Sequence, residues 1–242
     1  MNANIALLKL QACLSFVLFL AAITPAIAQL EPEQKKEPLP AISLAELAAA
    51  SDVVALVQMR DGDYRYQREY PVSGSAHLKV LVPYKVDQPL EFIEVYEHGL
   101  HENECYFPDP TVFEEGRRYL VFLKRDPEDE VRYRGLPQGC AIDVLVTKEF
   151  GYALRIPVTG IDLADPVLNF AVETSYSDPY AREPEDVLES HLRDQWLAAG
   201  WLRRDGSDLI YTMGVALDEV RALMGPAGVS LDWHQKRFEQ EP

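Results

Sequence analysis

The sequence predicts a mainly β protein, with a five- to six-stranded barrel, a short N-terminal helix and a helical C-terminal extension. Between residues 52 and 158, short runs of β-branched and aliphatic residues alternate with turn-forming residues, and almost no helical pattern lies among them. Such a series of strands is typical of a closed barrel or a sandwich. After residue 183, two segments instead repeat apolar residues at helical spacing.

The first 28 residues have the pattern of a secretory signal peptide. Lys9 carries their only charge, and an apolar run follows over residues 10–23. Ala26 and Ala28 provide the small side chains that signal peptidase requires, which predicts cleavage before Gln29. An uncleaved anchor is the alternative, although the apolar run is short for a membrane span. We therefore expect export, to a bacterial periplasm or the medium, with no stable membrane insertion after cleavage.

A linker and a short helix are expected next. Residues 29–42 combine prolines with charges and have no periodic apolar pattern, so they predict a flexible linker. Ser43 and Glu46 then have the spacing of a capping box, in which each residue caps the other's backbone. The alanine-rich residues that follow predict a helix over 43–50.

The strands are expected in the middle of the chain, within a barrel domain over 43–158. Asp61 and Gly62 predict a turn after the first strand, and the polar segment 63–70 only weakly extends that hairpin. Pro83 implies an edge position or a bulge, because proline lacks the N–H that a central strand needs. In chain order, the predicted strands are 52–60, 77–86, 90–97, 117–125, 140–147 and 152–158.

A mostly helical extension is expected over residues 159–242. Residues 183–200 begin with a proline and acidic residues and end at a glycine, as a helix does. Residues 215–224 predict a second helix. Trp196 and Trp201 flank the end of the first one and are expected to pack it onto the barrel, with a ligand cage as the alternative.

Charge and motifs exclude several classes of function. The formal net charge is −16, and removal of residues 1–28, with one lysine and no acid, makes it −17. Binding to nucleic acid or to an anionic membrane is therefore disfavoured. The sequence has no G-x-G-x-x-G or G-K-[ST] motif for a nucleotide and no G-x-S-x-G motif of a hydrolase. We expect no cofactor, and a non-enzymatic role is favoured over an enzymatic one.

Two cysteines, Cys105 and Cys140, remain after the predicted cleavage. Because exported proteins reside where thiols oxidise, these residues predict a disulfide. Two buried free thiols are the alternative.

Residues 51–158 resemble the netrin/TIMP-like (NTR-like) modules, in a bacterial exported form. The residues that carry the resemblance are Cys105, Phe113, Gly116, Tyr119, Leu120, Val121, Phe122, Leu123 and Cys140. The resemblance implies a secreted OB-like barrel that binds or supports other molecules. TIMP-type inhibitors chelate a protease zinc through an N-terminal cysteine. Here Gln29 is the predicted mature N-terminus, so inhibition by that route is not implied.

Two groups of side chains are candidates for binding. His98, His101 and Glu102 lie in the segment 97–105 and could hold zinc or copper, although a solvated acidic loop is the alternative. A protein, peptide or glycan partner could stack on tyrosines of the barrel, which otherwise serve as packing residues. These tyrosines are Tyr64, Tyr66, Tyr70, Tyr84 and Tyr96.

The expected function is thus an exported binding or scaffold protein. The alternatives are an exported enzyme or inhibitor with an unrecognised site, and a metal-handling protein that uses the segment 97–105.

Overall fold

The computed structural model describes residues 39–99, 105–108, 116–129, 131–164 and 166–226. The predicted signal peptide, its cleavage site between Ala28 and Gln29, and most of the linker lie outside these residues. From Leu39 onward the chain forms one unit, which is mainly β as predicted. No helix within the described ranges is long and apolar enough to cross a membrane.

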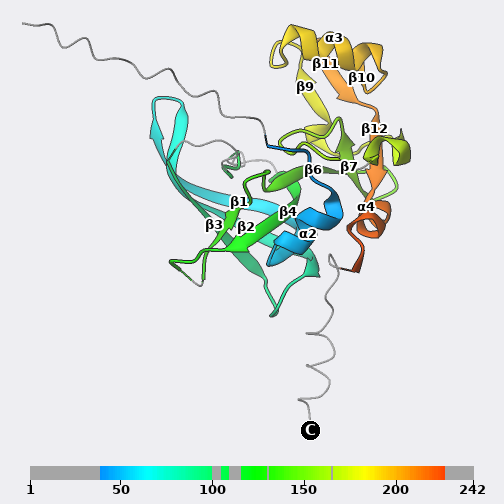
Figure 1. The fold of residues 1–242 in the computed structure, drawn as a ribbon. Coiled ribbons are helices and arrows are strands. Elements are labelled where there is room, and N and C mark those ends of the chain that lie inside the picture. The colour runs from blue at the N-terminus through cyan, green and yellow to red at the C-terminus, as the bar shows by residue number, and fades with distance from the viewer. Residues whose placement is uncertain (1–38, 100–104, 109–115, 130, 165, 227–242) are drawn as a thin grey trace, which may run out of the picture. The chain divides into compact units, whose positions relative to one another are not determined.

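Five strands close into a barrel (Figure 1). They are β1 (Val53–Gln67), β2 (Tyr70–Lys85), β3 (Phe92–His98), β4 (Arg118–Arg125) and β5 (Tyr133–Gly135). Their order is β1-β2-β3-β5-β4, and pairing of β4 with β1 closes the barrel. The pairs are antiparallel except for β3 with β5, which is parallel. The predicted five- to six-stranded barrel is confirmed, although β5 was not anticipated.

The sheet continues beyond the barrel and takes in part of the C-terminal extension. Next to β4 lie β6 (Ala141–Val146), β7 (Tyr152–Ile156), β12 (Met213–Ala216) and β8 (Val172–Glu173), in that order. Because β12 pairs with β7, the extension shares a sheet with the predicted barrel domain. The boundary expected after residue 158 therefore does not separate two sheets.

The hairpin of β1 and β2 corrects one prediction. Asp61 and Gly62 do not form a turn, because both lie within β1 and pair with β2. The turn comes at Arg68, which has a φ of 61°. Gly74 of β2 has a φ of 131°, and a Cβ there would collide with the backbone carbonyl of Asp63. Gly74 thus lets β1 and β2 approach closely beyond residue 60, where the sequence predicted that the first strand ends.

A bulge at Pro83 is confirmed. Val54 pairs with Lys85 and the next residue, Ala55, pairs with Pro83, so Tyr84 is skipped in the register. The proline occupies this irregular position without removing a hydrogen bond from a regular ladder.

The extension contains strands as well as helices in its described part. A second sheet has the order β10-β11-β9, made of β9 (Arg182–Pro184), β10 (Leu202–Asp205) and β11 (Asp208–Tyr211). The helix predicted over 183–200 is shorter, α3 (Ser190–Ala198), because residues 182–184 pair with β11. The other predicted helix begins after β12 as α4 (Leu217–Met224). Two short 3-10 helices, η2 (Val167–Phe170) and η3 (Pro179–Ala181), complete the described extension.

Buried apolar side chains of the described residues form three clusters. The first lies where α2 (Leu44–Ala50) and α4 pack against β1, β4, β6 and β7. The second fills the barrel. The third joins Leu145 of β6 to α3 and the three-stranded sheet. Trp196 is buried in this third cluster and Trp201 is partly buried beside it, so both pack within the C-terminal layer and not, as predicted, onto the barrel, whose interior cluster contains neither.

Two local predictions are also confirmed. Ser43 and Glu46 form the capping box of α2, with the Ser43 hydroxyl accepting from Glu46 N at 3.1 Å and Glu46 Oε2 accepting from Ser43 N at 3.0 Å. Cys105 and Cys140 form a disulfide. Gly135 of β5 lies against both cysteine side chains, where a larger residue would crowd them.

Candidate functional site

A buried ion network joins the barrel-side strands to the three-stranded sheet; it consists of Arg117, Asp143, Arg155, Glu183 and Tyr211. Arg155 of β7 is only 5% exposed and lies 2.6 Å from Asp143 of β6. Its Nη1 donates to the Tyr211 hydroxyl at 3.0 Å and lies 3.5 Å from Glu183 of β9. Arg117 reaches the same Glu183 oxygen at 3.3 Å. The network therefore spans the boundary between the two sheets.

Tyr211 takes part in this network as a neutral phenol. Burial, together with the carboxylates of Glu183 and Asp143, raises the pKa of Tyr211 to about 12, although Arg155 opposes this. The Arg155 guanidinium also lies over the Tyr211 ring, 4.5 Å from its centroid. A buried arginine whose charge is balanced by two carboxylates is a structural group. We assign it the role of holding the small sheet in place.

Asp178 fixes the chain segment that lies beside this network. Its side chain is 1% exposed and lies 3.4 Å from Arg118 of β4. One carboxylate oxygen accepts from Val146 N at 3.1 Å, and the other accepts from Tyr180 N at 3.0 Å at the start of η3. Both oxygens are therefore used internally, and the segment 172–178 is held against the end of β6.

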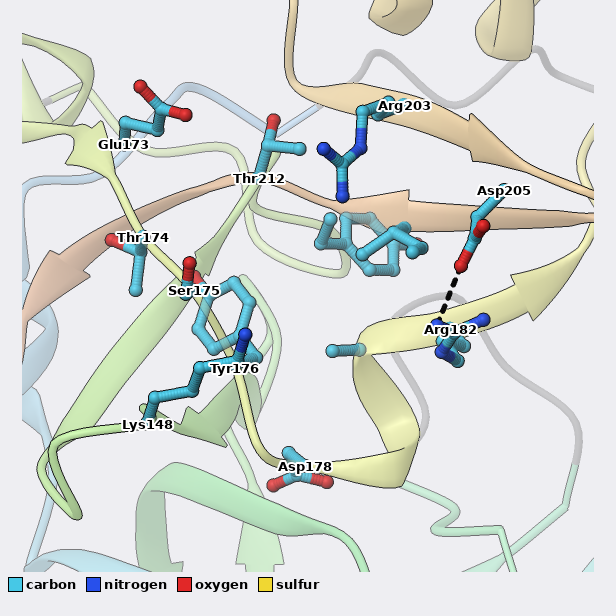
Figure 2. Close-up of a pocket in the computed structure, with 13 residues that line it drawn as sticks. Lys148, Glu173, Thr174, Ser175, Tyr176, Asp178, Arg182, Arg203, Asp205 and Thr212 are labelled. Carbon is cyan, nitrogen blue, oxygen red and sulfur yellow. Dashed lines mark hydrogen bonds and ion pairs between the residues drawn. The ribbon is translucent and has the colours of Figure 1, made fainter.

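A polar cavity of about 260 Å³ lies between these elements (Figure 2). It is bounded by the turn between β6 and β7, by the segment 173–178 and by residues of the three-stranded sheet. Its volume is slightly below the usual range of small-molecule sites, about 300–1,000 Å³. The cavity can therefore hold a small ligand or the end of a larger one.

The strand register places two arginines on one face of the three-stranded sheet, at this cavity. Ile210 of β11 pairs with Arg203 on one side and with Arg182 on the other, and all three line the cavity. Arg182 forms ion pairs with Asp205 at 2.7 Å and with Asp208 at 3.6 Å. Both of these aspartates on this face of the sheet are therefore paired with Arg182. Within the part of the chain that the structure describes, Arg203 has no carboxylate partner.

Lys148 approaches the same cavity from the turn between β6 and β7. Its backbone N–H donates to Ser175 O at 2.9 Å, and the Thr147 hydroxyl accepts from Gly151 N at 3.1 Å across the turn. Its ammonium group forms no ion pair with a described residue. Figure 2 shows Lys148 and Arg203 with their charged ends turned toward the cavity from different sides. Two elements far apart in sequence therefore bring unpaired positive charges to one space.

The remaining polar groups at the cavity divide into those already used and those available. The Tyr176 hydroxyl donates to Met213 O at 2.8 Å, and Thr212 donates to Gly200 O at 2.7 Å. Burial raises the pKa of Tyr176 well above its ordinary value, so it stays neutral. Ser175 and Glu173 are exposed at the cavity, and their side chains have no partner among the described residues.

The histidine candidates are only partly described. His98 is exposed at the end of β3, opposite Ser73. His101 and Glu102 lie outside the described residues. Within the residues that are described, no three His, Cys, Asp or Glu side chains are grouped as a metal site would require.

The tyrosine candidates do not form one face. Tyr64 contacts Tyr66 and Tyr106 edge to face, with ring centroids 6.5 Å and 5.2 Å away. Tyr84 packs against the first apolar cluster, whereas the Arg132 guanidinium covers the ring of Tyr96. Tyr66 and Tyr70 remain exposed near the hairpin turn. The five tyrosines therefore lie in different environments and do not form a single stacking surface.

The cavity itself was not predicted. Asp205 and Gly206 lie at the turn between β10 and β11, and such a D-G pair is a hairpin signal that would have indicated these two strands. It would also have placed Arg203 and Arg204 on opposite faces of a strand. No sequence pattern links Lys148 to these residues, since their proximity depends on the pairing of distant strands.

Comparison of the chain with protein-family models, curated proteins and solved structures found no match.

Proposed function

We propose that this protein is an exported, non-enzymatic binding protein in which an NTR-like barrel is the scaffold and the polar cavity is the ligand site. The observation that carries the proposal is the convergence of Lys148 and Arg203 on a cavity of about 260 Å³, without carboxylate partners among the described residues. Charged side chains without a partner at a concave surface are available to a ligand.

Export is supported by two independent features. The composition of residues 1–28 is that of a signal peptide. The disulfide between Cys105 and Cys140 suits an oxidising compartment. The resemblance to NTR-like modules agrees with both, and the closed barrel is the fold that such modules have.

A binding role fits the cavity better than catalysis does. The carboxylate of Asp178 is occupied by Arg118 and by backbone N–H groups, and the Tyr176 hydroxyl is neutral and already hydrogen-bonded. A general acid or base must be free to exchange a proton with the substrate. The groups that are available, Lys148 and Arg203, are suited to holding an anion.

Blocking the cavity tests this function. Ser175→Trp fills the opening without removing a hydrogen bond of the described structure, and Gln195→Trp adds the same side chain to an exposed position of α3 away from the cavity. A panel of small anions, sugars and short peptides is titrated into residues 29–242 and followed by NMR. We expect a ligand that binds the wild type and Gln195→Trp but not Ser175→Trp.

Three results would contradict the proposal. They are the absence of any binding ligand, binding that Ser175→Trp leaves intact, and conversion of the bound ligand to a product. Equal unfolding free energies of the two tryptophan variants show that a loss of binding does not come from misfolding.

A further inference from the structure

The charges at the cavity also indicate what kind of ligand it holds. Among its charged lining residues, Arg182, Asp205 and Asp178 are engaged in ion pairs within the protein. Lys148, Arg203 and Glu173 are not, as far as the described chain extends. The available side chains therefore carry one positive charge in excess, although the whole chain carries −16.

We propose, on the basis of the function proposed above, that the cavity binds a carboxylate, either of a small monocarboxylic acid or of the C-terminus of a peptide. An arginine presents parallel N–H donors that match a carboxylate, and a lysine adds a point charge. Arg203 is placed for the first role by the register of β10, and Lys148 for the second by its turn. The Ser175 hydroxyl offers a further donor at the rim.

The negative charges favour a singly charged ligand over a doubly charged one. Glu173 lines the cavity and would repel a second anionic group. The field of a protein with a net charge of −16 acts in the same direction. A carboxylate carries one negative charge, whereas inorganic phosphate near neutral pH carries a charge between one and two. Phosphate should therefore bind more weakly than a monocarboxylate.

The adjacent residues Arg203 and Arg204 provide a matched pair for testing the proposal. They have the same side chain on successive positions of β10, but Arg203 lines the cavity, whereas Arg204 pairs with Glu185 at 3.0 Å. Arg203→Met should lower the affinity for a carboxylate about ten- to hundredfold, the usual effect of losing a charge-assisted hydrogen bond. Arg204→Met should leave the affinity unchanged.

Glu173→Gln gives an independent test in the opposite direction. Removal of this negative charge should tighten carboxylate binding about two- to fivefold, and the increase should shrink as salt is added. A gain in affinity cannot arise from a variant that fails to fold.

The Lys148→Met variant should weaken carboxylate binding, because it removes the second positive charge at the cavity. Lys79→Met, at an exposed lysine of β2, is its control.

The probes separate the two sources of the carboxylate. A pool of N-acetylated tripeptides with free C-termini, the same pool as amides, a pool of small monocarboxylic acids and inorganic phosphate are titrated into residues 29–242. Binding is followed by NMR at the amides of Lys148, Ser175 and Arg203. Binding of the free peptide acids but not of the small acids identifies a peptide C-terminus, and the reverse identifies a free acid.

Binding of the amide peptides as tight as that of the peptide acids, or equal affinity of Arg203→Met and wild type, would overturn the carboxylate assignment. If neutral ligands still bound the wild type and Ser175→Trp blocked their binding, the proposed binding function of the cavity would be retained and only its specificity for a carboxylate would be rejected. If nothing bound the wild type, both proposals would fail together.

Discussion

Lys85 is a charged side chain that serves the backbone of another element. Its ammonium group donates to Ser51 O at 2.6 Å and to Ala48 O at 2.9 Å, with a longer bond to Ala49 O at 3.3 Å. These carbonyls lie at the C-terminal end of α2, where the helix leaves acceptors unsatisfied and where a positive charge is favourable. Lys85 thus ties the N-terminal helix to β2 of the barrel.

Replacement of Lys85 by methionine should destabilise the protein by about 1–3 kcal/mol, because partly buried carbonyls would lose charged donors. Methionine retains most of the apolar stem, so the packing changes little. Urea denaturation measures the effect, and Lys79→Met on the same strand is the control, with an expected change below about 0.5 kcal/mol. Equal losses in the two variants would show that the contacts of Lys85 contribute nothing.

Asp126 makes the stability of the loop between β4 and β5 depend on pH. Burial alone would raise the pKa of Asp126, but hydrogen bonds from Glu128 N at 2.8 Å and from Arg134 at 2.9 Å outweigh it and lower the pKa below its ordinary value of 3.8. Because the pKa of Asp126 is lower in the folded protein than in the unfolded chain, the ionised carboxylate stabilises the fold fully at pH values above the pKa of the unfolded chain. This contribution is lost as the pH falls through the folded pKa.

Asp126→Asn should therefore be less stable than the wild type near neutral pH, and the difference should shrink as the medium becomes more acidic than the folded pKa of Asp126. Free energies of unfolding measured from about pH 7 to about pH 2.5 test this. Asp186→Asn, at an exposed position whose side chain forms no hydrogen bond or ion pair with a described residue, should show no such convergence. A constant difference across the range would contradict the assignment.

At the scale of elements, local patterns predicted those strands whose own residues determine their structure. The segment 117–125 has an apolar centre and basic ends, and it became β4. By contrast, β5 has only the residues 133–135 and forms because β3 and β4 flank it. In the same way, residues 182–184 became β9 instead of a helix because β11 pairs with them. Short strands that form only by pairing with strands far away in the sequence have no local residue pattern from which they could be predicted.

The same reason explains why the cavity could not be predicted. Its cations belong to the turn after β6 and to β10, and pairing of β12 with β7 and β8 brings these elements together. The buried ion network also depends on this arrangement, since Arg155 lies on β7 and Glu183 on β9. The cysteine pair was predictable because the prediction needed only the expected oxidising compartment and the two cysteines that follow residue 28.

Arg155 and Asp143 test whether the ion network holds the two sheets together. Arg155→Met should destabilise the protein by about 3–5 kcal/mol, because it leaves the largely buried carboxylate of Asp143 without its ion-pair partner, whereas Glu183 keeps Arg117. Asp143→Leu should also destabilise it, and the double variant should lose less than the sum, with a coupling of about 1–3 kcal/mol.

Urea denaturation of the four proteins measures this coupling. The exposed pair of Arg182 and Asp205 has the same residue types at 2.7 Å and is the control, with an expected coupling below about 1 kcal/mol. Additive losses at Arg155 and Asp143 would show that the two side chains do not act as a unit.

The unit from Leu39 onward is built on a curved sheet whose two faces both carry apolar clusters of described residues. One face carries α2 and α4, and the other face encloses the barrel and, farther along the sheet, supports the three-stranded layer. The disulfide lies at the barrel, where it joins the segment before β4 to the start of β6 next to β5. It therefore links the segment between β3 and β4 to the residue that precedes β6, and β6 belongs to the part of the sheet that leads to the cavity.

Loss of this disulfide should affect the stability of the whole unit. The cysteines are 35 residues apart, and a cross-link over such a loop lowers the entropy of the unfolded chain enough to stabilise the fold by about 3–4 kcal/mol. Addition of a reductant to the wild type should lower the free energy of unfolding by this amount. The variant Cys105→Ala/Cys140→Ala should start at the lower value and not respond to the reductant. Because the cavity lies in the same unit, unfolding monitored at Tyr211 and at the barrel should shift together; a shift of the barrel signal alone would show that the two parts unfold independently.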